Sequence, residues 1–164
     1  MKKLLSAVLA LCMVLCAVSA LAEDAITEIT NEPTFEGDYV VLGDTGLAMY
    51  VPADFQEVDA PEGALGAMAN GEIAMTVAAV NTDMDTMWAD AEASVEAGEL
   101  KGVTEAYINE TYFVLVESAD GTQNGAYLEY DDGVILVFAF VAAEDTDAIT
   151  EAELEMLGSL TTVD

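Results

Sequence analysis

Acidic side chains supply most of the chemistry that this chain of 164 residues can offer. It contains 32 Asp and Glu residues, three Lys, and no Arg or His. The lack of His excludes the Ser-His-Asp and Cys-His mechanisms and also His-ligated zinc sites. Carboxylate catalysis and the binding of hard cations such as Ca²⁺ remain as possible site chemistries.

Residues 120–131 carry oxygen ligands at the spacing of a calcium loop. The candidate ligands are Asp120, Thr122, Asn124 and Asp131, and a glycine stands at the sixth place, where such loops turn. The last position is Asp rather than the bidentate Glu, and no helices are expected on either side. We therefore prefer a strand-to-strand turn built on Asp-Gly and Asn-Gly. Weak Ca²⁺ binding is the alternative, and we expect no other cofactor.

Asp44-Thr45-Gly46 matches the triplet of aspartic proteases, in which two aspartates share one proton. The residue before it is Gly43 rather than an apolar residue, and no later apolar-Gly segment supports the catalytic loop. Asp-x-Gly is also a common turn sequence. The preferred interpretation is a turn between two strands. A carboxylate hydrolase using Asp44 is the alternative.

Two other polar motifs have structural explanations. Asn81, Asp83 and Asp85 stand where a strand is expected to give way to a helix, which favours helix capping over metal binding. Asn109-Glu110-Thr111 is a glycosylation sequon. The N-terminal leader is of bacterial type, so we interpret the sequon as a hairpin turn.

The charge balance excludes several classes of partner. After residue 3 the only basic side chain is Lys101. Binding of nucleic acid or of an anionic membrane surface is excluded, because both need clusters of basic residues. An unknown protein, a cationic surface or divalent cations remain as partners. The simplest explanation of the acidity is a solvated, self-repelling surface. Lys101 follows Gly98, so we expect it to serve the end of a helix.

The N-terminus reads as a secretory leader. Lys2 and Lys3 precede an apolar run over residues 4–18, and Ala20-Leu21-Ala22 matches a cleavage site. These features predict a signal peptide over residues 1–22. The mature protein is therefore expected in an extracellular or cell-envelope location. A retained anchor and a lipoprotein are the alternatives. Both cysteines, at positions 12 and 16, would be lost on cleavage, so no disulfide is expected in the mature chain.

The remaining sequence predicts one α+β domain. Residues 23–38 are acidic and lack periodicity, which indicates an N-terminal arm or linker, and residues 39–164 form the domain. Strand-like segments are expected at 39–42, 47–51, 64–69, 72–80, 103–108, 112–117, 125–130 and 134–142. Asn70-Gly71 predicts a type I′ turn. The segment 134–141 is apolar throughout, which predicts a central strand that is buried on both faces.

Two helices complete the expected architecture. Met84, Met87, Trp88, Ala91 and Val95 recur on one helical face, which we assign to the core, and Gly98 ends this helix. A second helix is expected over residues 147–159. The prediction is an antiparallel sheet of about six to seven strands with one inserted helix and one C-terminal helix packed on it.

This order of elements resembles the PsbP-like superfamily, which includes an extrinsic photosystem subunit, a Ran-binding nuclear import factor and many small secreted bacterial proteins. The similarity rests on the segment Gly46-Leu47-Ala48-Met49-Tyr50-Val51-Pro52-Ala53-Asp54-Phe55, on the helix around Trp88 and on Leu157-Gly158-Ser159-Leu160. It covers residues 43–160. The resemblance implies a binding or assembly role and supplies no catalytic residue. We therefore expect a secreted, non-enzymatic binding protein. A calcium-stabilised module and a carboxylate hydrolase are the alternatives.

Overall fold

The computed structural model describes residues 26–142 and 148–163. The two helices are α2 (Met84–Glu96) and α3 (Ala148–Gly158). The strands are β1 (Thr27–Ile29), β2 (Gly37–Val41), β3 (Leu47–Pro52), β4 (Gln56–Glu57), β5 (Ala64–Ala69), β6 (Ile73–Asn81), β7 (Leu100–Ile108), β8 (Thr111–Ser118), β9 (Gln123–Asp131), β10 (Val134–Ala142) and β11 (Thr161–Thr162). The expected leader and its cysteines lie outside the described residues.

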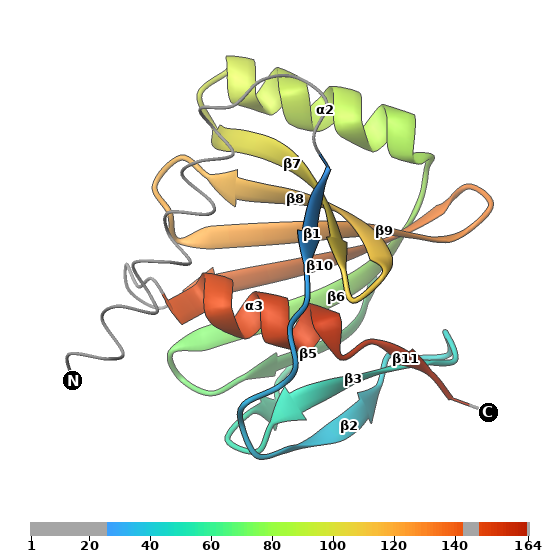
Figure 1. The fold of residues 1–164 in the computed structure, drawn as a ribbon, viewed down its shortest axis with the longest axis vertical. Coiled ribbons are helices and arrows are strands. Elements are labelled where there is room, and N and C mark those ends of the chain that lie inside the picture. The colour runs from blue at the N-terminus through green and yellow to red at the C-terminus, as the bar shows by residue number, and fades with distance from the viewer. Residues whose placement is uncertain (1–25, 143–147, 164) are drawn as a thin grey trace.

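The strands form a large mixed sheet and a small sheet (Figure 1). The large sheet has eight strands in the order β1-β7-β8-β9-β10-β6-β5-β4, and the small one has three in the order β11-β3-β2. The two predicted helices are both present, whereas the strand count exceeds the prediction. The additional strands β1, β4 and β11 have only two or three residues each, which is too short for an alternating pattern to show in the sequence.

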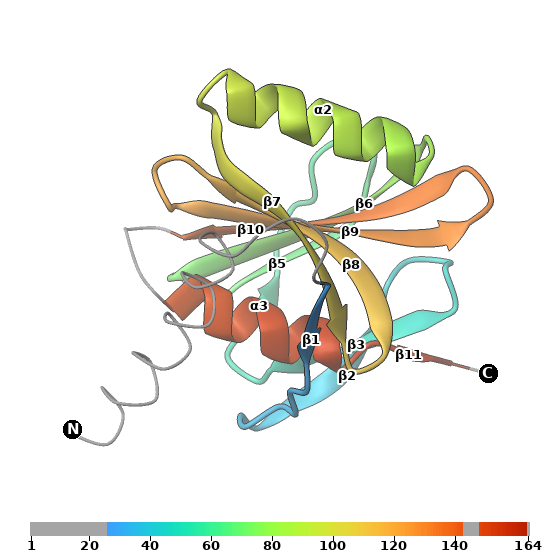
Figure 2. The same cartoon turned by 45° about the horizontal axis from the view of Figure 1, so that its top comes forward.

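The elements stack in three layers (Figure 2). The large sheet lies in the middle, with α2 on one face and α3 together with the small sheet on the other. The main core lies on the α3 side, where the aromatic rings of β8 and β10 meet α3 and β3. Its fully buried members include Phe113, Phe138, Phe140, Met156 and Met49. Neither described helix combines the length and apolarity needed to cross a bilayer.

Strand β10 occupies a central place, as its apolar run predicts, between β9 and β6. Its two faces differ in burial. Leu136, Phe138 and Phe140 are completely buried on the α3 side. On the α2 side Ile135 is buried, whereas Val141 is 39% exposed. The expectation of full burial on both faces is therefore correct only in part, because α2 covers only part of its face of the sheet.

The expected N-terminal arm is packed against the domain in its described part. β1 pairs in parallel with the end of β7, in the register Thr27↔Ala106 to Ile29↔Ile108. The side chain of Ile29 packs against the main core. Further along, the backbone amide and the hydroxyl of Thr34 donate to the carboxylate of Glu155 in α3. Residues 26–38 are therefore a structural edge rather than a linker.

The two predicted hairpin turns differ in type. A type I′ turn needs positive φ at both central residues. Asn109 and Glu110 meet this condition with φ of 46° and 70°. At the other turn the amide of Asn70 donates to the carbonyl of Ile73, so the central residues are Gly71 and Glu72 rather than Asn70 and Gly71. Gly71 has φ of 92°, whereas neither Asn70 nor Glu72 has a positive φ, and the Asn70 side chain accepts bonds from the amides of residues 72 and 73. The type I′ assignment of Asn70-Gly71 is therefore wrong, because the asparagine side chain shapes that turn.

Asn109 joins three parts of the chain. Its side-chain amide donates to the carbonyl oxygens of Asn31 and Gly158, and its Oδ1 accepts from the amide of Asn31 at 2.9 Å. The residue thus links the segment after β1, the β7–β8 turn and the end of α3. The sequon is a hairpin turn, as predicted, and its asparagine amide is used inside the fold.

The turn allows two opposite substitutions to be predicted. Glu110→Gly should raise the free energy of unfolding by about 1 kcal/mol, because glycine removes the steric cost of positive φ. Asn109→Gly keeps the backbone conformation but removes the side-chain hydrogen bonds, so it should lower the free energy of unfolding by about 1–3 kcal/mol. Urea denaturation measures both. A loss of stability in the Glu110 variant would contradict the strain argument.

Candidate binding site

The Asp44-Thr45-Gly46 triplet forms the turn between β2 and β3. The amide and hydroxyl of Thr45 both donate to the carbonyl of Leu42, at 3.2 and 2.7 Å, and Gly46 takes a φ of 71°. The side chain of Asp44 is exposed to solvent. Thr45 and Gly46 have local structural roles, as expected of an Asp-x-Gly turn. No observation in this region favours the protease alternative.

The four candidate calcium ligands are not brought together. Asp120 lies in the β8–β9 turn, where its Oδ1 accepts bonds from the hydroxyl of Ser118 and from the amide and hydroxyl of Thr122. Asn124 and Asp131 lie near opposite ends of β9. At about 3.3 Å per residue they are about 23 Å apart. An extended strand thus separates the members of the alternative four-residue site, while Asp120 and Thr122 form the strand-to-strand turn that the sequence analysis preferred.

The other acidic cluster acts as a helix cap. Asp83 is the N-cap of α2, and its Oδ1 accepts a bond from the amide of Thr86 at 2.7 Å. This bond lowers the pKa of Asp83. The capping interpretation is confirmed. Among the residues that the structure describes, no three acidic or other metal-binding side chains are placed to hold a metal ion.

A groove of about 350 Å³ lies between α2 and β7. Its lining is apolar in Trp88, Val95 and Val103 and acidic in Glu92 and Glu96. The sequence pattern assigns Trp88 and Val95 to the core, but Ala91 is the only residue of α2 that is buried. The core assignment is wrong for these two residues, since α2 lies over the edge of the sheet rather than over its centre.

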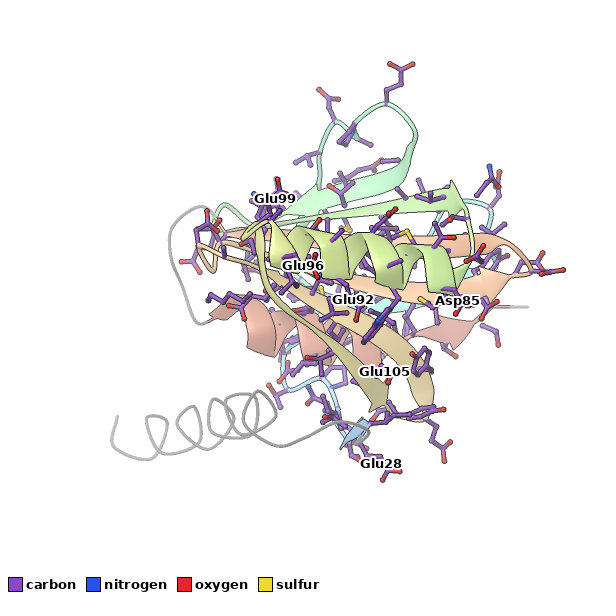
Figure 3. The ribbon with its side chains drawn as sticks, turned by 90° about the horizontal axis from the view of Figure 1, so that it is seen from above. Glu28, Asp85, Glu92, Glu96, Glu99 and Glu105 are labelled. Atoms are coloured by element: carbon purple, nitrogen blue, oxygen red, sulfur yellow. The ribbon has the colours of Figure 1, made fainter. Side chains whose placement is uncertain are left out.

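Figure 3 labels six carboxylates on the side of the molecule that carries α2, and two of them, Glu92 and Glu96, line the groove. Asp85, Glu92 and Glu96 come from α2, Glu99 from the connection to β7, Glu105 from β7 and Glu28 from β1. Glu105 accepts a bond from the hydroxyl of Tyr112. We call these six residues the acidic rim.

The single basic residue of the described chain is used elsewhere. Lys101 donates to Glu117 and forms the one ion pair found in the described residues. The register of β7 shifts between Leu100 and Gly102, before its regular part begins. Lys101 lies at this register shift, and its amine is close to Gly121 in the β8–β9 turn. The helix-end role expected for Lys101 is therefore wrong, and the described residues supply no second basic side chain for the acidic rim.

Sequence reasoning missed the groove, although the sequence carries a sign of it. Glu92 and Glu96 follow Trp88 by four and eight residues. This spacing places them on the same helical face as the tryptophan. A face that mixes an aromatic ring with two acids is a poor core face, and that mixture could have predicted an open surface.

Glu153 of α3 is the most unusual buried group. Burial raises the pKa of its carboxyl well above the usual value, a hydrogen bond from Asn124 opposes the rise, and the charge of Glu117 adds to it. Its Oε1 is buried and has no hydrogen-bond partner among the described residues. The carboxyl lies on the α3 side of the large sheet, away from the groove.

Comparison with solved structures supports the fold. The solution structure of cyanobacterial PsbP (CyanoP) from Synechocystis sp. PCC 6803 matches with a TM-score of 0.52 and 11% identity, covering 87% of this chain and 99% of that one. A crystal structure from Bacteroides thetaiotaomicron VPI-5482 matches with a TM-score of 0.49 and 13% identity, covering 79% of this chain and half of that one. No protein-family model matches the sequence, and no curated protein is similar to it. The protein therefore has a PsbP-like fold.

The hydrogen bonds of Asp120 predict how the stability of the β8–β9 turn depends on pH. Hydrogen bonds from Ser118 and Thr122 lower the pKa of Asp120 to about 2. The stabilisation they give is present above about pH 4 and is lost as the pH falls through about 2. Asp120→Ala should therefore lower Tm at pH 7, with a smaller difference near pH 2, whereas Asp120→Asn keeps the Oδ1 acceptor and should lower it less.

Millimolar Ca²⁺ and Mg²⁺ should raise Tm equally in the wild type and in Asp120→Ala, because both ions screen the surface repulsion. Calorimetry measures the shift. A saturable rise that is specific for Ca²⁺ and abolished by Asp120→Ala would restore the calcium site.

Glu153→Gln should stabilise the protein at neutral pH. The unfolded carboxyl ionises above about pH 4.3, whereas the raised pKa lets the folded carboxyl keep its proton to a higher pH, so wild-type stability falls as the pH rises. The gain in Tm should be small at pH 4 and larger at pH 7. Glu155→Gln is the control, because that carboxylate already accepts bonds from Thr34. Equal effects of the Glu153 change at both pH values would contradict the raised pKa.

Proposed function

We propose that this protein is a secreted, non-catalytic binding or assembly protein, and that it takes a cationic segment of another protein into the groove between α2 and β7. The observation that carries the proposal is the groove itself, whose lining combines three apolar side chains with Glu92 and Glu96 of the acidic rim. Its location outside the cell rests on the leader. The fold likeness is compatible with binding but says nothing about the partner.

The groove suits the side chains of Lys and Arg. These residues have long apolar stems and a charged end, so they can cover Val95 and Val103 while the charge stays near the rim. The indole of Trp88 can also attract a cation over its face. An apolar residue of the partner would occupy the rest of the groove.

The charges on α2 also argue that the rim is more than a solvated surface. Glu92 and Glu96 are four residues apart, and like charges at this spacing destabilise a helix by a few tenths of a kcal/mol. Glu96 also stands in the last turn, which contains no basic residue and where the helix dipole disfavours a negative charge. A cationic partner would relieve both effects.

The two alternative functions lack support in the same region. The calcium module would require ligands that lie far apart, and the hydrolase would require an activated carboxylate where Asp44 forms an exposed turn. Neither alternative uses the groove, which makes the binding proposal the more economical one.

Glu96→Lys tests the proposal because it should change stability and binding in opposite directions. The lysine would pair with Glu92 and suit the helix end, so the free energy of unfolding should rise by about 0.5–1 kcal/mol. Binding of a peptide of alternating Lys, Thr and Val should weaken at least tenfold at low salt. Fluorescence anisotropy and urea denaturation measure the two effects.

Asp90→Lys is the matched control on the same helix. Asp90 faces β9, where its charge contributes to the raised pKa of Tyr127. The net charge changes equally in both variants, so a purely diffuse attraction would weaken both equally. Equal weakening would reject the groove as the site, and the absence of peptide binding even at low salt would reject the proposed function.

A further inference from the structure

We propose that the cationic segment binds in an extended conformation, as a strand added to the open edge of β7 beside α2. This inference rests on the proposed function and specifies how the partner is recognised. It predicts a partner sequence in which basic and apolar residues stand two positions apart, so that both enter the groove from one face of the added strand.

The edge of β7 is only partly covered. Within residues 26–142 and 148–163, β1 pairs with β7 at Ala106–Ile108, whereas residues 100–105 have a neighbouring strand only on the β8 side. An open edge offers backbone amides and carbonyls to an incoming chain. Strand addition to such an edge is a common way of binding a peptide.

The hairpin register indicates which backbone groups face outward. A two-residue turn closes on a hydrogen-bonded pair, here Ile108 and Thr111, and such pairs alternate with non-bonded pairs along an antiparallel ladder. Val103 and Glu105 fall in non-bonded pairs, so their amides and carbonyls point away from β8. The parallel pairing of Thr27 with Ala106 engages the carbonyl of Glu105, which leaves the amide of Glu105 and both backbone groups of Val103 at the open edge. The amide of Asn109 fits this alternation, since it donates outward to the carbonyl of Ile29.

The same two residues present their side chains to the groove. Val103 lines it directly, and Glu105, two positions further along the strand, lies on the same face of the sheet. A strand paired with this edge would place every second side chain beside Val103, Glu105 and the α2 residues. An apolar side chain fits against Val103 and Val95, and a basic one fits near Glu105 and Glu92.

The ends of the edge limit the length of the added strand. At one end the irregularity at Leu100 and Gly102 and the charge of Lys101 interrupt the edge, as in strands that resist unwanted pairing. At the other end β1 begins. The paired part of the partner is therefore short, about four residues, and side chains in the groove must add to its affinity.

Charge selects the occupant of this edge. A second copy of this chain brings an equally acidic surface, and the residues that precede β1 in the sequence include Glu23 and Asp24. Both would add negative charge beside Glu28 and Glu105. A cationic partner lowers the repulsion, which is the reason for assigning the edge to a different protein.

Two N-methylated peptides test the mode of binding. The probe is the peptide Lys-Thr-Val-Thr-Lys-Thr-Val, made without modification, with its odd-numbered amides methylated, or with its even-numbered amides methylated. An added strand turns one set of amides toward β7 and the other toward solvent. One methylated peptide should therefore bind at least tenfold more weakly than the unmodified peptide, and the other should bind within about twofold of it.

The other results would overturn the proposal. Equal binding by all three peptides would mean that charge alone holds the segment, and loss of binding in both methylated peptides would indicate a helix. In both cases the proposed function would stand, provided that Glu96→Lys still weakens the unmodified peptide. Val103→Pro, which removes one edge amide, should weaken binding more than Val103→Ala, and equal losses would count against the edge.

Discussion

The ion pair between Lys101 and Glu117 engages the only basic side chain in the described residues. The rest of the structure depends on this shortage of positive charge. Ion pairs cannot hold such a chain together, and after loss of the expected leader it would contain no disulfide. Cohesion must come from apolar burial and from hydrogen bonds such as those of Asn109. Since the described residues contain no other basic side chain, their exposed carboxylates form a strongly negative surface.

The two faces of the large sheet differ in how far they are covered. The α3 side is sealed, with Phe113, Phe138 and Phe140 completely buried beneath α3 and the small sheet. The α2 side is more open, because α2 lies near the β7 edge and Ala91 is the one residue of this helix that is buried, although Ile135 of β10 is also buried on that side. Stability is therefore concentrated on one face, which leaves the other free to carry an apolar groove and an acidic rim.

Much of the fold could be predicted from the sequence, and the exceptions have physical causes. The long strands and both helices follow from periodicity, and β10 follows from its unbroken apolar run. The strand β1 could not be predicted, because three residues have no period and its pairing with β7 joins positions about 80 apart in the chain. Tertiary position also decided the role of Trp88, since its helical face meets the rim of the sheet instead of the core.

The predictions about sites depended on the same distinction between local and distant structure. Two local motifs were interpreted correctly, the Asp83 cap and the Asn109 turn, whereas the turn type expected of Asn70-Gly71 was wrong. The calcium pattern failed because ligand spacing in sequence implies proximity only in a loop, and Asn124 and Asp131 lie in one strand. The groove escaped prediction because Val103 and Trp88 come together only in the folded chain.

The central claim is that a cationic segment occupies the groove between α2 and β7. It is tested most directly by following the amide and indole resonances of the ¹⁵N-labelled protein while the Lys-Thr-Val peptide is added at physiological ionic strength. The account predicts the largest shifts at the Trp88 indole and at the amides of Val103 and Glu105, with little change at the turns containing Asp44 and Asp120. Shifts distributed over all acidic surfaces, including those turns, would contradict it.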